Sequence, residues 1–450
     1  MTEINPLVTA YGLRRLQAGE VNISKLRKEN TNNAVYNMAI CYRDGIKVAQ
    51  NLKKSFNLLK QLVDIGCDTD ALYLLAQYYR FGYGVEQDLL KYRELLKQYV
   101  SDYGESLANP NDIYYYALTL EDEDIQKAVH VYTDLVENFD YLKAKVRLGD
   151  LYAFNSQIKD ERKSLEWYME AASEGDVIAQ NQLGAHLYFI GGSYITQSYE
   201  KAAYWVKKAA EQGFALAQNN LGVFYVKGWG VTQNYEKAMY WLEKAAEQGN
   251  VSAQRSLGGC YCNGLGVTQD YEKAVYWFKR AAKQGDADAQ NSLGRCYRDG
   301  RGIIQSYKEA AYWFEKAAEQ GNADAQYILG EYYRDGLGVA QGYEKAAYWF
   351  EKTAEQGNAD GQCAIGMLYL QGNGVIRSEE KAAYWFEKAA EQGNADAQTR
   401  LGVLWYNGYK SKSGTVKNIL IGKFWINKAA EQGNKLAIML NEIEKMANDI

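Results

Sequence analysis

A repeat of 36 residues dominates this chain and constrains its fold more than any other feature. Its clearest copy, EKAAYWFEKAAEQGNADAQ, begins at Glu380, and near-copies begin at Lys308 and Glu344. Six tryptophans mark the period in consecutive copies: Trp205, Trp241, Trp277, Trp313, Trp349 and Trp385. Self-similarity at such a period is the signature of a repeat architecture, in which stacked units share one continuous core. We therefore predict a single stack of units, although a chain of 450 residues would ordinarily suggest roughly three domains.

Each well-formed unit is predicted to be a pair of helices. In one unit, apolar residues recur every four positions from Ala325 to Tyr333, which predicts a first helix over residues 322–334. The segment DGLGV predicts a glycine-rich turn, and the apolar spacing after it predicts a second helix over residues 343–357. The expected fold is all-α, a solenoid of about 11–12 antiparallel helical hairpins.

Two repeated residues are expected to have structural roles. Glycine recurs in the middle of the first helix, as at Gly258, Gly294 and Gly330. A glycine there costs about 1 kcal/mol relative to alanine, so we expect a neighbouring helix to approach closely, under the tryptophan and tyrosine rings. The tryptophans of the second helix are predicted to be core residues, each worth about 3–5 kcal/mol if fully buried.

The regularity of the repeats divides the chain into four parts. Residues 1–30 do not fit the pattern and are expected to form an N-terminal helical cap. Residues 31–178 are degenerate repeats, with a kink or an irregular hairpin expected near residues 100–125. Residues 179–433 are regular repeats, the last of which carries an insertion at 409–418. Residues 434–450 are expected to form a capping helix whose end is polar.

The composition argues against several classes of protein. The net charge of −5 is spread without a basic block, so we expect no nucleic-acid partner. The first 30 residues lack the apolar core of a signal peptide, and no apolar run of 18 residues predicts a membrane span. The six cysteines show no recurring pair, which favours free thiols in a reducing compartment. These features predict a cytoplasmic protein, with export by a signal-independent route left open.

No catalytic, cofactor-binding or metal-binding set is predicted. The two histidines, His130 and His186, have no partner nearby in the sequence, and Cys260 and Cys262 form CxC without a second cluster that would complete a zinc site. The GxG pairs recur between helices rather than after strands, so they are interpreted as turns and not as phosphate loops. The acidic run at 121–124 is interpreted as a solvated turn or helix start in preference to a cation site.

A binding surface is predicted where nearly identical repeats differ. In hairpin solenoids the first helix tends to line the inner groove, and its variable positions here are Arg255, Asn291, Arg295, Arg298, Tyr327, Glu331, Arg334 and Met367. Arginine, tyrosine and methionine are enriched in interface cores. The four arginines suggest a mildly basic groove for an acidic peptide. The alternative is neutral drift at exposed positions.

One unit shows a family resemblance especially well. The motif A…LG..Y..G.GV followed by KA..W…AA.QG resembles the Sel1-like repeat family, a relative of the tetratricopeptide repeats. It falls here on Ala289, Leu293, Gly294, Tyr297, Gly300, Gly302, Ala310, Trp313, Ala317, Ala318, Gln320 and Gly321. The resemblance is strong over residues 179–433 and weak over 34–178. It implies a right-handed α-superhelix that scaffolds protein complexes.

Three functions follow from this resemblance. The first is a non-enzymatic bacterial scaffold or adaptor that binds a protein or peptide in its concave groove. The second is a secreted effector that binds a host protein. The third is a β-lactam-binding hydrolase, because some relatives with paired cysteines in each repeat are linked to penicillin binding. This chain lacks that pairing. The resemblance leaves the partner and the oligomeric state open.

Overall fold

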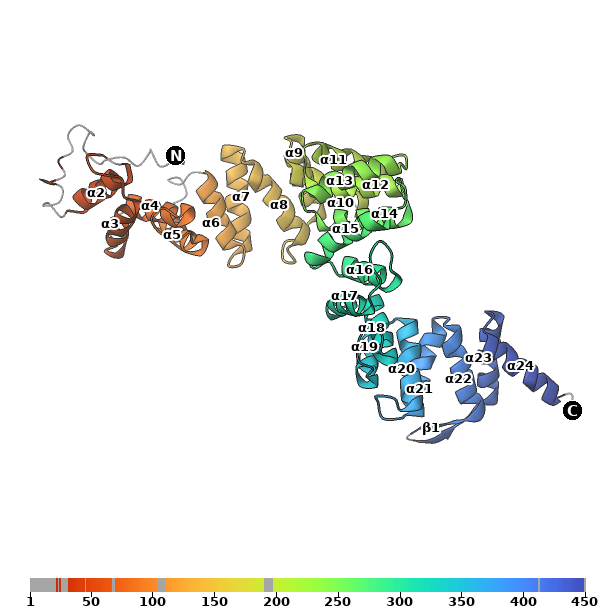
Figure 1. Cartoon of the computed structure of the whole chain (residues 1–450). Helices are drawn as coiled ribbons and strands as arrows, with labels where there is room; N and C mark the ends of the chain where they lie inside the picture. Colours follow the sequence, from red (N-terminus) through yellow and green to blue (C-terminus); the bar gives the residue numbers. More distant parts are fainter. Residues whose placement is uncertain are drawn as a thin grey trace. The chain divides into compact units, whose positions relative to one another are not determined.

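The structure is a computed structural model that describes residues 22, 24–25, 31–44, 46–66, 69–103, 110–189, 197–411 and 413–448. The cap expected over residues 1–30 therefore lies almost entirely outside the described residues. The helices α2 to α24 follow one another through the described part of the chain (Figure 1). They fall into two compact units, Met1–Gln197 and Ser198–Ile450.

The first unit is a series of helical hairpins followed by a single helix. Its elements are α2 (Asn32–Asp44), α3 (Leu52–Asp64), α4 (Thr69–Phe81), α5 (Leu89–Tyr103), α6 (Pro110–Leu120), α7 (Ile125–Phe139), α8 (Leu142–Phe154), α9 (Glu161–Ser173) and α10 (Val177–Phe189). Residues 104–109, in the region expected to be irregular, lie outside the description. After them α6 has only 11 residues, and a short turn at 121–124 replaces the glycine-rich one. Asp124 caps α7 and Glu121 accepts hydrogen bonds from Arg147, so this acidic run is a turn.

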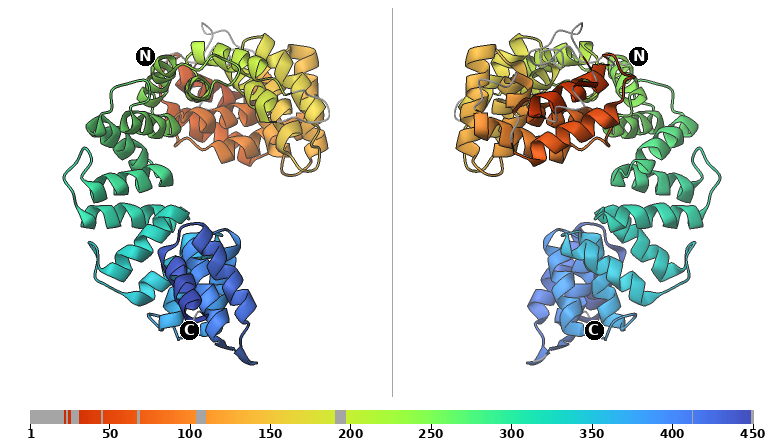
Figure 2. Two further views of the ribbon diagram at one scale, coloured as in Figure 1. Left: turned by 90° about the vertical axis from the view of Figure 1, so that its right-hand side faces the viewer. Right: turned by 90° about the vertical axis from the view of Figure 1, so that its left-hand side faces the viewer.

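The second unit is more regular, and its consecutive hairpins lie side by side (Figure 2). Its helices are α11 (Tyr199–Glu211), α12 (Ala215–Lys227), α13 (Tyr235–Glu247), α14 (Val251–Asn263), α15 (Tyr271–Lys283), α16 (Ala287–Asp299), α17 (Tyr307–Glu319), α18 (Ala323–Asp335), α19 (Tyr343–Glu355), α20 (Ala359–Gln371), α21 (Glu379–Glu391), α22 (Ala395–Asn407), α23 (Ile419–Glu431) and α24 (Lys435–Asn448). From α12 to α23, the even-numbered helices are the first helices of the hairpins and the odd-numbered ones are the second helices.

Local chemistry sets where these helices begin and end. Asn322 caps α18 by accepting a hydrogen bond from the backbone N–H of Ala325 at 2.9 Å. Gly336 ends the same helix in the left-handed conformation with φ +74°. Two residues later, a Cβ at Gly338 would overlap the backbone of Tyr307, so only glycine lets the turn pass that closely over α17.

The glycine in the middle of each first helix makes room for an aromatic or branched side chain of the second helix. A Cβ at Gly330 would lie 2.6 Å from the ring of Phe350, and one at Gly294 would lie 2.7 Å from the ring of Phe314. The ring that needs this space belongs to the phenylalanine that follows the tryptophan. Both phenylalanines have no exposed surface.

The tryptophans themselves are only half-buried and pack at the edge of the core, so the prediction that they form its interior was wrong. The reason is helical geometry. In α19 the buried face carries Ala346, Phe350 and Ala354, which recur at four-residue spacing. Trp349 is one position earlier and therefore points about 100° away from this face.

Two features mark the C-terminal end. The inserted residues form a small antiparallel hairpin, β1 (Tyr409–Ser411) and β2 (Gly414–Val416), which the sequence did not predict. The last helix, α24, leaves apolar side chains in solvent, since Leu436, Met439 and Ile443 are each at least 43% exposed. No helix in the described ranges is long and apolar enough to cross a membrane.

Candidate binding surface

The eight residues predicted to contact a partner lie on four first helices of the second unit. Arg255 is on α14; Asn291, Arg295 and Arg298 are on α16; Tyr327, Glu331 and Arg334 are on α18; and Met367 is on α20. The structure divides them into a group at a cavity, a group on α18, and two residues with little exposed surface.

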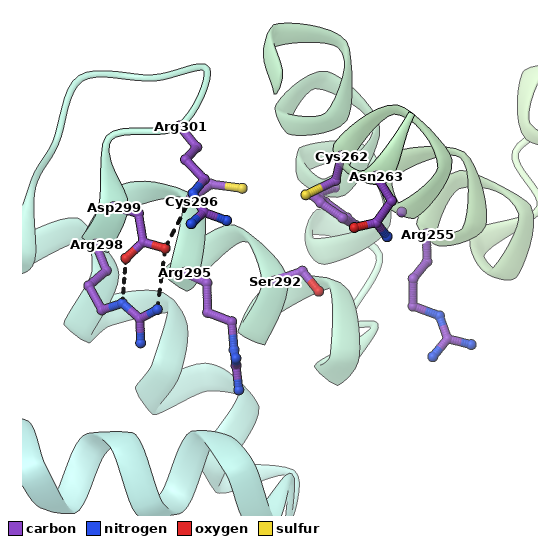
Figure 3. A pocket seen from close by; sticks show the side chains of 11 residues that line it. Arg255, Cys262, Asn263, Ser292, Arg295, Cys296, Arg298, Asp299 and Arg301 are labelled. Atoms are coloured by element: carbon purple, nitrogen blue, oxygen red, sulfur yellow. Dashed lines mark hydrogen bonds and ion pairs between the residues drawn. The ribbon is translucent and has the colours of Figure 1, made fainter. Parts of the chain in front are cut away.

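The first group lines a cavity of about 500 Å³ between the neighbouring first helices α14 and α16. The cavity brings together Arg255, Arg295 and Arg298, which are 43 residues apart at most in the sequence. Figure 3 shows Arg255 coming from α14 and the other two from α16. A fourth arginine, Arg301, also lines the cavity and was not predicted, because it lies in the turn after α16 and not on a first helix.

One residue that lines the cavity is Gly259, which directly follows the packed glycine Gly258 on α14. A Cβ at Gly258 would lie 2.5 Å from the ring of Phe278, whereas a Cβ at Gly259 would meet nothing within 4 Å. The corresponding residues of the next two hairpins are Arg295 and Glu331. Gly259 therefore leaves open space where other repeats carry a side chain, at a cost of about 1 kcal/mol in helix stability.

The inner wall of the cavity contains the Phe278 ring and two thiols. The sulfurs of Cys262 on α14 and Cys296 on α16 point toward one another across the space between the helices (Figure 3). Burial raises the pKa of the Cys296 thiol to about 11, and the nearby Cys262 thiol adds to this rise. Cys296 is therefore protonated at neutral pH, and both cysteines are free.

On the α16 side, one carboxylate holds two of the arginines. Arg298 Nε donates to Asp299 Oδ1 at 2.7 Å, and Arg301 Nε lies 3.6 Å from Asp299 Oδ2. The hydrogen bond from Arg298 holds the pKa of the Asp299 carboxyl below its usual range and raises the pKa of the guanidinium. Asp299 therefore stays ionised at the mouth of the cavity.

The other two arginines form ion pairs with the next first helix in the stack. Arg255 pairs with Asp288 at the start of α16, and Arg295 Nη2 donates to Asp324 at the start of α18 at 3.2 Å. All four side chains are more than one third exposed, and exposed pairs of this kind contribute only about 0–1 kcal/mol. The surface is consequently less basic than a count of its arginines suggests, but the residues that line the cavity still include four guanidiniums and one carboxylate.

The second group forms a separate cluster on α18. Arg334 Nη2 lies 2.7 Å from Asp335 Oδ2 and 3.4 Å from Glu331 Oε1, while the Tyr327 hydroxyl donates to Glu331 at 3.3 Å. The Tyr327 ring packs on the Phe350 ring, with the centroids 5.7 Å apart. These side chains hold one another, and none of them lines the cavity between α14 and α16.

Two predicted contact residues offer little surface to a partner. Asn291 is only 8% exposed, and its buried Oδ1 has no hydrogen-bond partner among the described residues. Met367 is half-buried and packs against the core of the second unit. Both residues lie on the side of the first helix that faces neighbouring helices. Variation between repeats does not show on which side of a helix a residue lies.

The residues considered for chemistry lie apart from this surface. His130 is 75% exposed, and its Nε2 lies 3.4 Å from Asp134 Oδ2 one turn along the same helix. The side chain of His186 falls outside the description. Cys260 is buried, and within the described ranges no three His, Cys, Asp or Glu side chains gather closely enough to hold a metal ion.

Comparison with known structures places the whole chain among similar solenoids. It resembles a protective antigen, c5321, of uropathogenic Escherichia coli that displays an SLR fold, with 28% identity and a TM-score of 0.65 over 95% of this chain and 91% of that one. It also resembles a Sel1 repeat protein of Oxalobacter formigenes, with 32% identity and a TM-score of 0.55 over 75% of this chain and 94% of that one. No curated protein matches the sequence.

The family model of the Sel1 repeat matches ten segments of the chain. They are residues 32–66, 69–96, 142–176, 177–214, 215–250, 251–286, 287–322, 323–358, 359–394 and 395–434. Each segment from residue 142 onward contains two consecutive helices of the stack. Together they cover well over half of the sequence, and the hairpin fold agrees with them. The chain belongs to the Sel1 repeat family.

Proposed function

We propose that this protein is a non-catalytic scaffold or adaptor that binds a partner protein through the first helices α14, α16 and α18. The observation that carries this proposal is the cavity between α14 and α16, which occurs where nearly identical repeats diverge. Sel1 repeat solenoids are typical of scaffolds for protein interactions, and the family therefore supports the same general role.

The repeated residues provide a rigid frame for such a surface. Gln284 Nε2 donates to Gln254 Oε1 at 2.8 Å, and Gln254 Nε2 donates to the carbonyl of Ala246 at 3.0 Å. The same pair of bonds recurs at Gln320 and Gln290 one repeat later. Because these buried bonds connect consecutive hairpins, the first helices keep a fixed spacing and their variable side chains are held in place before a partner arrives.

We further propose that the partner presents an acidic segment to α14 and α16. The cavity wall carries more guanidinium than carboxylate groups, and the pairs of Arg255 with Asp288 and of Arg295 with Asp324 are exposed. Arg255 Nε also lies 3.7 Å from Asp286 Oδ2. A partner's carboxylates can replace Asp288 and Asp324 at these arginines at little cost, since such pairs contribute little to stability. Charge complementarity of this kind contributes mainly to specificity and to the rate of association.

A charge-reversal experiment tests the proposal. The triple variant Arg255→Glu, Arg295→Glu, Arg298→Glu should lose the partners captured by the tagged wild-type protein from cells that express it. The matched control reverses three exposed lysines on second helices, Lys316→Glu, Lys352→Glu and Lys388→Glu, and should keep them. Circular dichroism melts verify that both variants fold. If both variants capture the same partners as the wild type, the surface assignment is wrong.

We propose the cytosol as the place of action, with one observation in favour of a second candidate. The similar protein of uropathogenic Escherichia coli is described as a protective antigen, which favours a protein that meets the host outside the cell. Tagging the chain and fractionating the cells distinguishes the two. A signal in the culture medium or on the cell surface supports the second candidate, and a signal confined to the cytosol removes it.

A further inference from the structure

The cavity between α14 and α16 includes the open space beside Gly259. Gly258 is explained by packing, because any larger residue would collide with Phe278. Gly259 has no such explanation, since a side chain there would extend into open space. At the corresponding place α16 carries Arg295 and α20 carries Met367. The opening therefore exists because one residue lacks a side chain.

We propose that this opening is a pocket that receives an anionic side chain, a carboxylate or a phosphoryl group, from an extended segment of the partner protein. The proposal rests on the proposed scaffold function and adds to it the site at which the partner is anchored. The volume of about 500 Å³ lies within the range of small-ligand sites, so one or two side chains can enter.

The arginines retain donors that can bind such a group. A guanidinium has five N–H groups, and Arg298 directs only Nε and Nη2 toward Asp299. Arg295 directs Nη2 toward Asp324. The remaining N–H groups can form paired hydrogen bonds with a planar carboxylate or with phosphate oxygens, which is the geometry for which arginine is suited.

The inner wall makes these bonds stronger than they would be on an open surface. The Phe278 ring and the protonated Cys296 thiol also line the cavity, so part of its wall is apolar. A charged hydrogen bond gains strength where the local dielectric constant is lower. The pocket thus combines guanidinium groups with a wall that is partly apolar.

Cys262 provides a built-in reporter, because its half-buried thiol lines the cavity. We would measure the labelling of Cys262 by the anionic reagent 2-sulfonatoethyl methanethiosulfonate and by its cationic trimethylammonium analogue. Each rate is divided by the rate of the same reagent with the uncharged thiol 2-mercaptoethanol and is followed by mass spectrometry of the Cys262 peptide. The anionic reagent should be favoured by about tenfold, and the preference should shrink in 0.5 M salt and in Arg295→Gln. A normalised ratio of one or less would overturn the pocket.

A variant that fills the cavity with a side chain provides a second test. Gly259→Met places in α14 the residue that α20 carries at Met367, and it should slow the labelling of Cys262 by both reagents. Val223→Met makes the same change at the corresponding position of α12 and should leave the labelling unchanged. Equal labelling of Cys262 in Gly259→Met and in the wild type would mean that this position does not control the cavity.

Competition with defined peptides identifies the anion and separates this inference from the scaffold function. Octaglutamate should protect Cys262 from labelling where octaglutamine does not, and protection by an octapeptide of alternating phosphoserine and glycine alone would assign the pocket to phosphorylated partners. Protection by neither anionic peptide overturns the inference. If Gly259→Met captures partners as well as the wild type while the triple arginine variant does not, the pocket inference fails and the scaffold function stands. If the triple variant also captures them, the scaffold surface itself is wrong.

Discussion

At the scale of single residues, the two adjacent glycines of α14 have opposite roles. Gly258 makes room for the Phe278 ring, while Gly259 faces open space. We therefore expect Gly258→Ala to destabilise the second unit by about 1–3 kcal/mol through overpacking. Gly259→Ala should stabilise it by about 1 kcal/mol through helix propensity. Urea unfolding of both variants beside the wild type measures the difference, and a shift of the same sign in both would contradict this account of the two positions.

The half-buried tryptophans lead to a second prediction for single residues. Phe350 has no exposed surface and fills the space over Gly330, so Phe350→Ala should cost about 3–5 kcal/mol. Trp349 lies at the edge of the same core and contacts the exposed Tyr348 ring at 4.9 Å between centroids. Trp349→Ala should therefore cost clearly less than Phe350→Ala, although tryptophan is the larger residue. Equal shifts of the urea midpoint in the two variants would show that Trp349 contributes to the core as much as Phe350 does.

At the scale of the helical elements, paired glutamines connect each hairpin to the next. Gln290 is 5% exposed, donates to the carbonyl of Ala282 at 3.1 Å and accepts from Gln320 at 2.8 Å. Gln290→Leu keeps most of the volume but removes both of these hydrogen bonds, at about 0.5–1.5 kcal/mol for each. We expect lower stability and faster amide hydrogen exchange where α15 ends and α16 begins. The exposed Gln305→Leu in the following turn is the control.

The sequence was informative about elements wherever the governing interactions are local. The helix predicted over residues 322–334 and the glycine-rich turn after it depend on interactions within a few residues. The structure has α18 at Ala323–Asp335, followed by Gly336 in the left-handed conformation. The hairpin β1–β2 was missed because strands of three residues carry no alternation that could be recognised. The cavity was missed because it depends on the absent side chain of Gly259 and on the gap between two helices one repeat apart.

At the scale of the whole molecule, the two units bury different aromatic residues. In the first unit the largest fully buried side chains are tyrosines, among them Tyr78, Tyr92, Tyr132 and Tyr168. In the second unit they include Phe314, Phe350 and Phe386. Tyr168 packs on Gly149 as Phe350 packs on Gly330, and its hydroxyl donates to Asp150 at 2.6 Å. The same structural position is therefore polar in one unit and apolar in the other.

This difference predicts that alkali above about pH 10 destabilises the hairpin α8–α9, where Tyr168 packs on Gly149, before the hairpin α12–α13, where Leu242 packs on Gly222. Burial raises the pKa of Tyr78 to about 12 and raises that of Tyr168 as well, with the neighbouring Asp150 adding to the second shift. In the unfolded chain a tyrosine loses its proton near pH 10. The unfolded state then binds fewer protons than the folded state, so the free energy of unfolding is unaffected below about pH 10 and decreases as the pH rises toward the folded pKa.

Hydrogen exchange followed by mass spectrometry between pH 8 and 11 can separate the two units within the full chain, once the rates are corrected for the intrinsic effect of pH. Amides of α8 and α9 should lose protection at a lower pH than those of α12 and α13. Tyr168→Phe introduces the residue of the second unit at the equivalent place, removes one titrating group and should reduce the loss of protection in α8 and α9 above pH 10. Simultaneous loss in both units, unchanged by Tyr168→Phe, would show that the buried tyrosines do not set the alkaline limit. A reduced loss in Tyr168→Phe would show that exchanging a buried tyrosine for phenylalanine is enough to change how a repeat responds to alkali.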